Sequence, residues 1–543
     1  MVFARRSTTL LAAIIASCAM VLSLTACTSD NKTVVDGQTT VTSNSAGGVA
    51  VFTPSDGITL NQQTPLNKWA KLVPDLAKAL ADAGFKKGDI NHTTSDSLDK
   101  QSRAIQDFVV DHLSNNTTDD SGIAIAPDNM TLLVAPVVEA DASTRQYGDY
   151  VSQNLSTNDV TDEGATSDGE SSEDDSSKDD SSNTESDSTA SDEQAQAVDR
   201  LVSSLKLAKE SGMHVVLLGN SIEGYKPDAF VKFSDAQTIG KLQAEKMVSK
   251  LKLDKASKDN PKYIEVLLPY TAVDEKGNAN DSTFAQEAFR GIWQVLGSYY
   301  QKGVVESPSG TLDGKSTEND WQAVAYDAAK EGSTAKVLDK RLAKTDGQPT
   351  LTRIDGIITM NDYIASEVVK ELDDLGYTGS AADINPQITI SGIVGNITGK
   401  KDLSRDAVPD PIKSPENDNA NDSSSSDDDA DEDTSASDKD RDSQWPLVTG
   451  YGAYVSNIPS IVNGKQWMTG MEDRQTIATD IAQACAKLNK DEALNSMPSI
   501  RNSEVGGVKK IPTISEPLLA VSASNLKSAL IDPGYISLAD AGL

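Results

Sequence analysis

The chain has 543 residues, with 82 Asp and Glu against 49 Lys and Arg, and therefore a formal net charge of −33. This charge excludes a general nucleic-acid-binding protein, because contacts with phosphates require clustered Lys and Arg, and it disfavours binding to anionic lipid headgroups. The length leaves room for two to four domains, but only 37% of the residues are hydrophobic, which indicates a folded part diluted by polar tracts.

Residues 1–26 are predicted to be a secretory signal peptide. Arg5 and Arg6 precede an apolar run from Thr8 to Leu24, which is typical of a signal peptide rather than of a membrane-spanning helix. The residues Leu-Thr-Ala before Cys27 resemble a bacterial lipobox. The resemblance implies cleavage before Cys27 and a diacylglycerol on its thiol; the alternative is an ordinary signal peptide with a chance cysteine. Residues 27–47 would then be a lipid-anchored flexible linker on the extracytoplasmic face of the cell membrane.

Short β-branched runs alternate with amphipathic helical patterns along most of the remaining chain. Strands are expected at 49–52, 131–135, 214–218, 263–268, 303–306, 356–359, 387–393 and 446–449, and helices at 75–83, 98–113, 193–211, 238–251, 283–300, 321–331 and 364–375. Near-continuous apolar strands separated by helices indicate parallel sheets with helices on both faces. Because these elements are too many for one sheet of usual size, the sequence predicts an α/β protein with two doubly wound parallel-sheet lobes.

Two acidic tracts interrupt this alternation. Residues 156–197 contain 14 acidic residues and one Lys, and residues 416–442 contain 12 acidic and two basic residues. Tracts of this composition bury too little apolar surface to offset chain entropy, so both are predicted to be disordered insertions. Their Asp-Ser repeats lack the spacing of a calcium loop, and no metal site is predicted.

Motifs of catalysis and cofactor binding are absent from the sequence. There is no HExxH, CxxC, GxSxG, GxGxxG or Walker sequence, so we expect neither an enzyme nor a cofactor. The carboxylates would permit a glycosidase on paper, but a sequence cannot show that two of them converge. Cys485 is the only cysteine expected in the mature fold and lies in a helical pattern, which favours a small buried hydrophobe over a nucleophile.

Polar and aromatic residues follow several of the predicted strands or precede the first helix. In the ligand-binding edge of a doubly wound sheet these positions come together. Planar rings cover the apolar faces of a sugar, while amides, carboxylates and ammonium groups satisfy its hydroxyls, so the mixture is typical of a site for a neutral polyhydroxylated ligand. For each residue alone, core packing is the competing interpretation. The candidates are Lys68, Trp69, Asn220, Asp235, Asn361, Asp362 and Tyr451.

Several longer runs resemble sugar-binding type 1 periplasmic binding proteins. They are residues 206–242, Ile357 to Asp362, Val448 to Tyr451 and Asn463 to Thr469, while the tail from Val508 to Leu543 looks like the ending of the xylose and multiple-sugar branch. The resemblance implies the solute-binding component of an ABC importer, a monomer whose partners are a monosaccharide or small oligosaccharide and the permease subunits. It also implies a sugar enclosed between two lobes that the chain crosses near Asp235, Gly450 and Ser515. Lobe 1 would then comprise 48–234 and 451–515, and lobe 2 would comprise 235–450 and 516–543.

The same resemblance assigns roles to individual residues. Lys68 and Trp69 look like a basic–Trp pair facing the sugar, Asp235 like the Asp at the first crossing, and Asn361 and Asp362 like a ligand-bonding pair in lobe 2.

Three departures from the family pattern imply a ligand that is larger or less hydrogen-bonded at one end. An Asp-Arg pair is replaced by Gly219-Asn220, and a Gln-Asp pair by Tyr451-Gly452. Expected asparagines are displaced, with Asn280 and Asp281 the nearest candidates. Two other interpretations stay open: a lipoprotein that senses a sugar or signal molecule for a membrane receptor, and a structural or adhesive surface lipoprotein.

Overall fold

The computed structural model describes residues 34–35, 38–39, 46–55, 65–115, 125–138, 145–150, 153–156, 185–273, 280–343, 351–381 and 443–543. The predicted signal peptide, Cys27, the strand expected at 387–393 and the tract 416–442 lie outside these residues, as do 157–184 of the first tract. Within the described ranges, no helix has the length and apolar character needed to span a membrane. Two short strands, β1 (Val34–Val35) and β2 (Gln38–Thr39), pair with each other.

The larger sheet has seven strands in the order β17-β18-β9-β7-β5-β3-β4. All neighbouring strands are parallel except the antiparallel pair of β17 and β18. The strands are β3 (Gly48–Pro54), β4 (Ile90–Ser95), β5 (Met130–Val134), β7 (His214–Leu218), β9 (Ala229–Lys232), β17 (Ile500–Val505) and β18 (Val508–Ser515). Strands β6 (Asn154–Leu155) and β8 (Ser221–Ile222) form a separate short pair.

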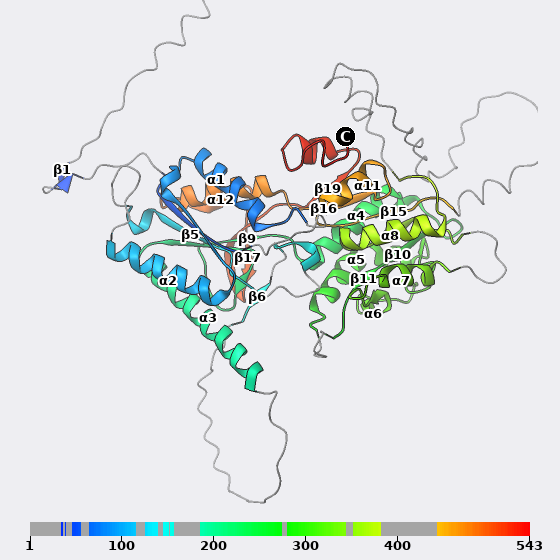
Figure 1. Ribbon diagram of the computed structural model, residues 1–543, viewed down its shortest axis with the longest axis horizontal. Helices are drawn as coiled ribbons and strands as arrows, with labels where there is room; N and C mark the ends of the chain where they lie inside the picture. The colour runs from blue at the N-terminus through cyan, green and yellow to red at the C-terminus, as the bar shows by residue number, and fades with distance from the viewer. Residues whose placement is uncertain are drawn as a thin grey trace, which may run out of the picture.

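Helices cover both faces of this sheet (Figure 1). Along β3, Val49 and Val51 pack against α1 (Trp69–Asp82) and α12 (Arg474–Leu488). The alternate residues Ala50 and Phe52 pack against α2 (Leu98–Asn115) and α3 (Glu185–Glu210). Because successive side chains of a strand point to opposite faces, this apolar run supplies two separate cores.

The first acidic tract was expected to be disordered over residues 156–197, but its residues 185–197 belong to helix α3. The buried residues Val198, Leu201 and Leu205 fix the later turns of α3 against the sheet. Once these turns exist, each further residue adds one hydrogen bond without a new nucleation step, and the helix extends toward the acidic residues. Arg200 also pairs with Asp99 of α2 at 2.7 Å.

The second sheet has four parallel strands in the order β12-β10-β14-β15. They are β10 (Lys262–Val266), β12 (Val305–Glu306), β14 (Gly356–Ile358) and β15 (Leu447–Val448), and the pair β11 (Leu268–Pro269) and β13 (Ala325–Tyr326) lies next to them in the chain. One face packs against α4 (Ala236–Lys250) and α5 (Thr283–Gln301), and the other against α7 (Ser333–Arg341) and α8 (Asp362–Leu375). The predicted α/β class with two parallel-sheet lobes is confirmed.

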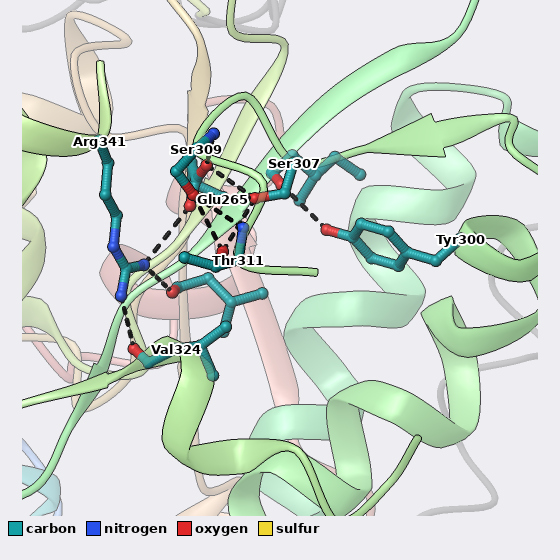
Figure 2. A network of polar contacts seen from close by, with 9 residues as sticks. Glu265, Tyr300, Ser307, Ser309, Thr311, Val324 and Arg341 are labelled. Atoms are coloured by element: carbon teal, nitrogen blue, oxygen red, sulfur yellow. Dashed lines mark hydrogen bonds and ion pairs between the residues drawn. The ribbon is translucent and has the colours of Figure 1, made fainter. Parts of the chain in front are cut away.

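A buried ion pair lies beside the part of β10 that has no strand partner on the β12 side (Figure 2). Strand β10 pairs with β12 only at its first two residues, and further along the chain β11 pairs with β13. Between these pairings, the Glu265 carboxylate accepts hydrogen bonds from Ser307 Oγ and Ser309 N, both at 2.8 Å, and lies 3.4 Å from Arg341 Nη1. Arg341 also donates to the carbonyls of Val266 and Val324, so side chains replace the missing strand neighbour.

The chain passes between the two sheets three times, at 233–235, 472–473 and 516–518. The resemblance places the second passage near Gly450, whereas in the structure it lies further along the chain, at 472–473. Residues from Tyr451 to Met471 form a further layer on the second sheet, in which Tyr451 bridges to Gly470 and β16 (Met468–Met471) pairs with β19 (Leu519–Ser522). The remaining elements are α6 (Trp321–Val324), α11 (Ile458–Val462), the π-helix Lys527–Ile531 and the 3₁₀ helices Lys87–Asp89, Pro127–Asn129, Arg145–Tyr147, Leu253–Lys255, Val455–Asn457 and Leu494–Ser496.

Candidate functional site

The carboxyl ends of the strands in both sheets face each other across a polar boundary, which we call the seam. From the first sheet it contains Gln146 and Tyr147, which follow β5, and Ser234, which follows β9; from the second it contains Asn361 and Tyr451, which follow β14 and β15. Glu472 of the second passage lies between them. Parallel α/β sheets bind ligands at this edge, so the seam is the candidate functional site.

The segment Gln146–Tyr150 is fastened to the amino end of α1. The carboxylate of Asp149 pairs with Lys68 Nζ at 2.7 Å and accepts the backbone N–H of Trp69 at 3.1 Å. It thereby caps a helix whose own N-cap residue, Lys68, offers no side-chain acceptor. Gly148 has φ +99°, and a Cβ there would lie 2.6 Å from the carbonyl oxygen of Asn67, so this position requires glycine.

The indole of Trp69 lies in the core of the first lobe. Its side chain is buried, and its ring packs edge-on against Tyr150 at 5.0 Å and Phe233 at 5.8 Å between ring centroids. Tyr150 in turn stacks on Phe233 and donates its hydroxyl to the carbonyl of Lys68. Both members of the predicted Lys68–Trp69 pair are thus in contact with the Gln146–Tyr150 segment.

Asn361 joins the two sheets through its side-chain amide. As the N-cap of α8, it accepts the N–H of Ile364 at 2.9 Å through Oδ1, and its Nδ2 donates to Gln146 Oε1 at 3.0 Å. The hydroxyl of Tyr454 donates to the carbonyl of Gln146 at 2.6 Å. The Tyr147 ring lies 4.7 Å from Phe284, at the start of α5, so the segment contacts the second lobe through apolar as well as polar atoms.

Asp362 is a fully buried carboxylate that is hydrogen-bonded to residues of the segment 451–471. It accepts hydrogen bonds from Tyr454 N, Gln466 Nε2 and Thr469 Oγ1 at 2.7–2.9 Å. Burial raises its pKa to about 6, although these bonds favour the ionised form. A Cβ on Gly450 would lie 2.2 Å from Asp362 Oδ1, which explains the glycine before Tyr451.

Tyr451, Ser234 and Glu472 form a buried polar cluster at the passages. The hydroxyls of Tyr451 and Ser234 are 2.5 Å apart, and Glu472 Oε1 accepts the backbone N–H of Ser234 at 2.6 Å. The Tyr451 hydroxyl lies 3.5 Å from the same carboxylate oxygen. Burial raises the pKa of Glu472 to about 7 and that of Tyr451 well above its usual range. The cluster therefore links two chain passages through a carboxyl group that can change its charge near neutral pH.

The other four predicted residues bond to nearby protein atoms. Asn220 donates to the carbonyl of Pro136 and accepts the N–H of Gln153. Asp235 is the N-cap of α4 and bonds to Thr238 and Lys232; burial acts to raise its pKa, but these bonds outweigh it and the pKa is lowered. Asn280 donates to the carbonyl of Thr271, and Asp281 accepts from Thr283 at the start of α5.

The structure therefore brings four of the nine predicted residues together around one segment: Lys68, Trp69, Asn361 and Tyr451. Sequence reasoning missed that segment and also Glu472. A signal for the segment was present, because Tyr147-Gly148-Asp149-Tyr150 places two aromatic rings, a glycine and a carboxylate in a loop after a predicted strand. Glu472 carries no such local signal.

The chemistry at the seam is that of hydrogen bonding and ring packing. Among the described residues, no group of three or more His, Cys, Asp or Glu side chains could hold a metal ion. Cys485 is fully buried in α12, and burial raises its thiol pKa, which disfavours the thiolate that a nucleophile needs. Amide, carboxyl and hydroxyl groups with adjacent aromatic rings can bind a polar neutral molecule.

No protein-family model matches the chain, and no curated protein matches it. Among solved structures, it is similar to an ABC transporter solute-binding protein from Clostridium phytofermentans with bound β-D-glucose (16% identity, 91% of this chain and 99% of that chain, TM-score 0.44). It is also similar to a carbohydrate transporter solute-binding protein from Chloroflexus aurantiacus in complex with D-glucose (18%, 92% and 98%, TM-score 0.42). A periplasmic solute-binding protein from Actinobacillus succinogenes with bound D-allose is a third (10%, 89% and 99%, TM-score 0.37).

Proposed function

We propose that the protein is an extracytoplasmic solute-binding lipoprotein that captures a sugar at the seam between its two lobes and delivers it to an ABC importer. The observation that carries the proposal is the meeting of the strand carboxyl ends of two parallel sheets, with amide, carboxyl and aromatic side chains from both. A ligand bonded to both lobes stabilises the closed form by its differential affinity for that form.

The residue types at the seam suit an uncharged carbohydrate. Asn361 is an amide that donates and accepts, as sugar hydroxyls require, and the aromatic ring of Tyr451 lies at the same edge of the second sheet. The carboxyl groups of Glu472 in the seam and of Asp362, the residue after Asn361, are fully buried with raised pKa values, so they offer little attraction to a cationic ligand. A neutral ligand with several hydroxyls fits this set of groups best.

The test is calorimetric titration and thermal-shift measurement of the purified protein against a panel of mono- and oligosaccharides. We expect at least one sugar to bind, and Asn361→Asp to weaken it at least tenfold, about 1.4 kcal/mol. This variant keeps the oxygen that caps α8 and removes the Nδ2 donor. Asn502→Asp, an equal change of charge on the exposed part of β17, is the matched control and should bind normally. A folded protein that no sugar stabilises would contradict the proposal.

The lipid anchor is tested separately at Cys27. In a host that processes lipoproteins, we expect an alkyne-labelled fatty acid to be incorporated into the protein and the protein to sediment with membranes. Cys27→Ser should abolish both, whereas Cys485→Ser, a change in a buried position of α12, should abolish neither. Membrane association that survives Cys27→Ser would refute the anchor without bearing on sugar binding.

A further inference from the structure

The segment Gln146–Tyr150 contacts both lobes at once. On one side, Asp149 and Tyr150 fasten it to the amino end of α1, through Lys68 and Trp69. On the other side, Gln146 and Tyr147 reach the second lobe. The ring of Tyr147 is 1% exposed and belongs to the apolar core that α4 and α5 form on the second sheet, although the residue follows β5 of the first sheet.

The partners of this segment are the groups that a ligand at the seam would use. The Nδ2 of Asn361 donates to Gln146 Oε1 at 3.0 Å. The Tyr451 ring lies beside Tyr147, with 6.3 Å between the ring centroids. Each of these contacts uses a side chain that the sequence predicted to bind ligand, and each joins atoms from opposite lobes.

We infer that Gln146–Tyr150 is a built-in occupant of the seam, which holds the two lobes together in the absence of ligand and which a ligand must displace. This inference rests on the proposed function. It makes the ligand-free protein an equilibrium between a form with the segment docked on the second lobe and a form with the seam free. The apparent affinity for ligand is then lowered by the fraction of molecules whose seam is free.

Closure without ligand is measured by the distance between two spin labels on opposite lobes of the full chain. Suitable sites are Lys226 and Lys258, which are exposed on the first and second lobes respectively, changed to cysteine in a chain whose Cys18 and Cys27 are serine. Cys485 is fully buried and can stay. The measurement contains no sugar, so it is independent of the proposed function.

The test variant is Gln146→Ala with Tyr147→Ala, and the matched control is Tyr147→Phe, which keeps the ring that packs on Phe284. We expect the double variant to shift the distance distribution to longer values and the control to match the wild type. Gln146→Ala alone, at a partly exposed position, serves if the double variant fails to fold, and it should give a smaller shift in the same direction. A folded double variant with the wild-type distribution would overturn the inference.

The second measurement is the affinity for any sugar that binds the wild type. We expect the double variant to bind it at least threefold more tightly, because no segment has to be displaced. If the lobes of the double variant open but its affinity for the sugar does not rise, the inference that the segment competes with the ligand is overturned. If no sugar binds either protein but the double variant opens, the proposed function fails, whereas the role of the segment in holding the lobes together stands.

Discussion

Two buried carboxylates, Glu265 and Glu472, differ in what surrounds them. Glu265 lies inside the second lobe and faces the guanidinium of Arg341, with side-chain exposures of 0% and 8%. Glu472 lies between the lobes and bonds to neutral donors, the N–H of Ser234 and the hydroxyl of Tyr451. Glu265 has a cation beside it, whereas the burial of Glu472 among neutral groups favours its protonated form. The first carboxylate therefore fixes one lobe, and the second makes the junction between lobes sensitive to pH.

The largest expected effect is on the ion pair of the second lobe. Arg341→Met should lower the free energy of unfolding by about 3–5 kcal/mol, because it leaves the Glu265 carboxylate buried without a counter-ion. Chemical denaturation measures the change. The matched control is Lys527→Met, which removes an exposed pair with Asp532 and should cost about 0–1 kcal/mol. Equal losses in both variants would refute the distinction between the two kinds of pair.

The next effect is the pH dependence that Glu472 brings. Its folded-state pKa of about 7 lies above the ordinary value of 4.5. The folded protein therefore binds the proton more tightly, and this stabilisation is present in full below about pH 4.5 and is lost as the pH rises toward 7. The shift corresponds to about 3 kcal/mol.

Glu472→Gln should remove the part of this slope that Glu472 contributes and leave the part due to Asp362, whose pKa is raised to about 6, because the amide oxygen still accepts the Ser234 N–H and position 472 gains no charge at high pH. Denaturation midpoints measured at intervals between pH 4 and 8 provide the test. Glu492→Gln, a change in an exposed pair with Lys487, is the control and should retain the slope. A Glu472→Gln profile that is parallel to the wild type would show that Glu472 does not titrate in this range.

The sequence was sufficient for the features that arise locally and insufficient for those that arise between distant residues. Apolar runs such as 214–218 and 263–268 predicted the parallel strands because a strand buried on both faces needs apolar residues throughout. The first helix was expected from residue 75, after Pro74, but it begins at Trp69. Its first turn is capped by Asp149, which lies 80 residues away in the chain, and no local pattern contains that contact.

The same reason separates the predicted site from the observed one. Asn361 and Tyr451 were found because each follows a strand, and the carboxyl ends of parallel strands share one edge. That Gln146 and Tyr147 lie against them depends on how the two sheets are placed, which periodicity within one lobe does not determine. Trp69 has the planar ring that stacking on a sugar requires, but its contacts with Tyr150 and Phe233 place that ring in the core of the first lobe.

A third carboxylate extends the comparison to the protein surface and gives the smallest expected effect. Asp149 pairs with Lys68 at side-chain exposures of 20% and 16% and accepts the Trp69 N–H. Asp149→Ala should lower the free energy of unfolding by about 1 kcal/mol through loss of the cap, and it should speed hydrogen exchange in the first turn of α1.

Asp149→Asn separates the two roles of this carboxylate, because an amide oxygen can still cap the helix while the charge opposite Lys68 is lost. Since a partly exposed ion pair contributes little, the Asn variant should stay within about 0.5 kcal/mol of the wild type. Equal destabilisation by Asn and Ala would assign the effect to charge rather than to capping. In that case the ion pair of the partly exposed Asp149 would contribute to stability as the buried pair of Glu265 does, and burial alone would not decide which ion pairs stabilise the fold.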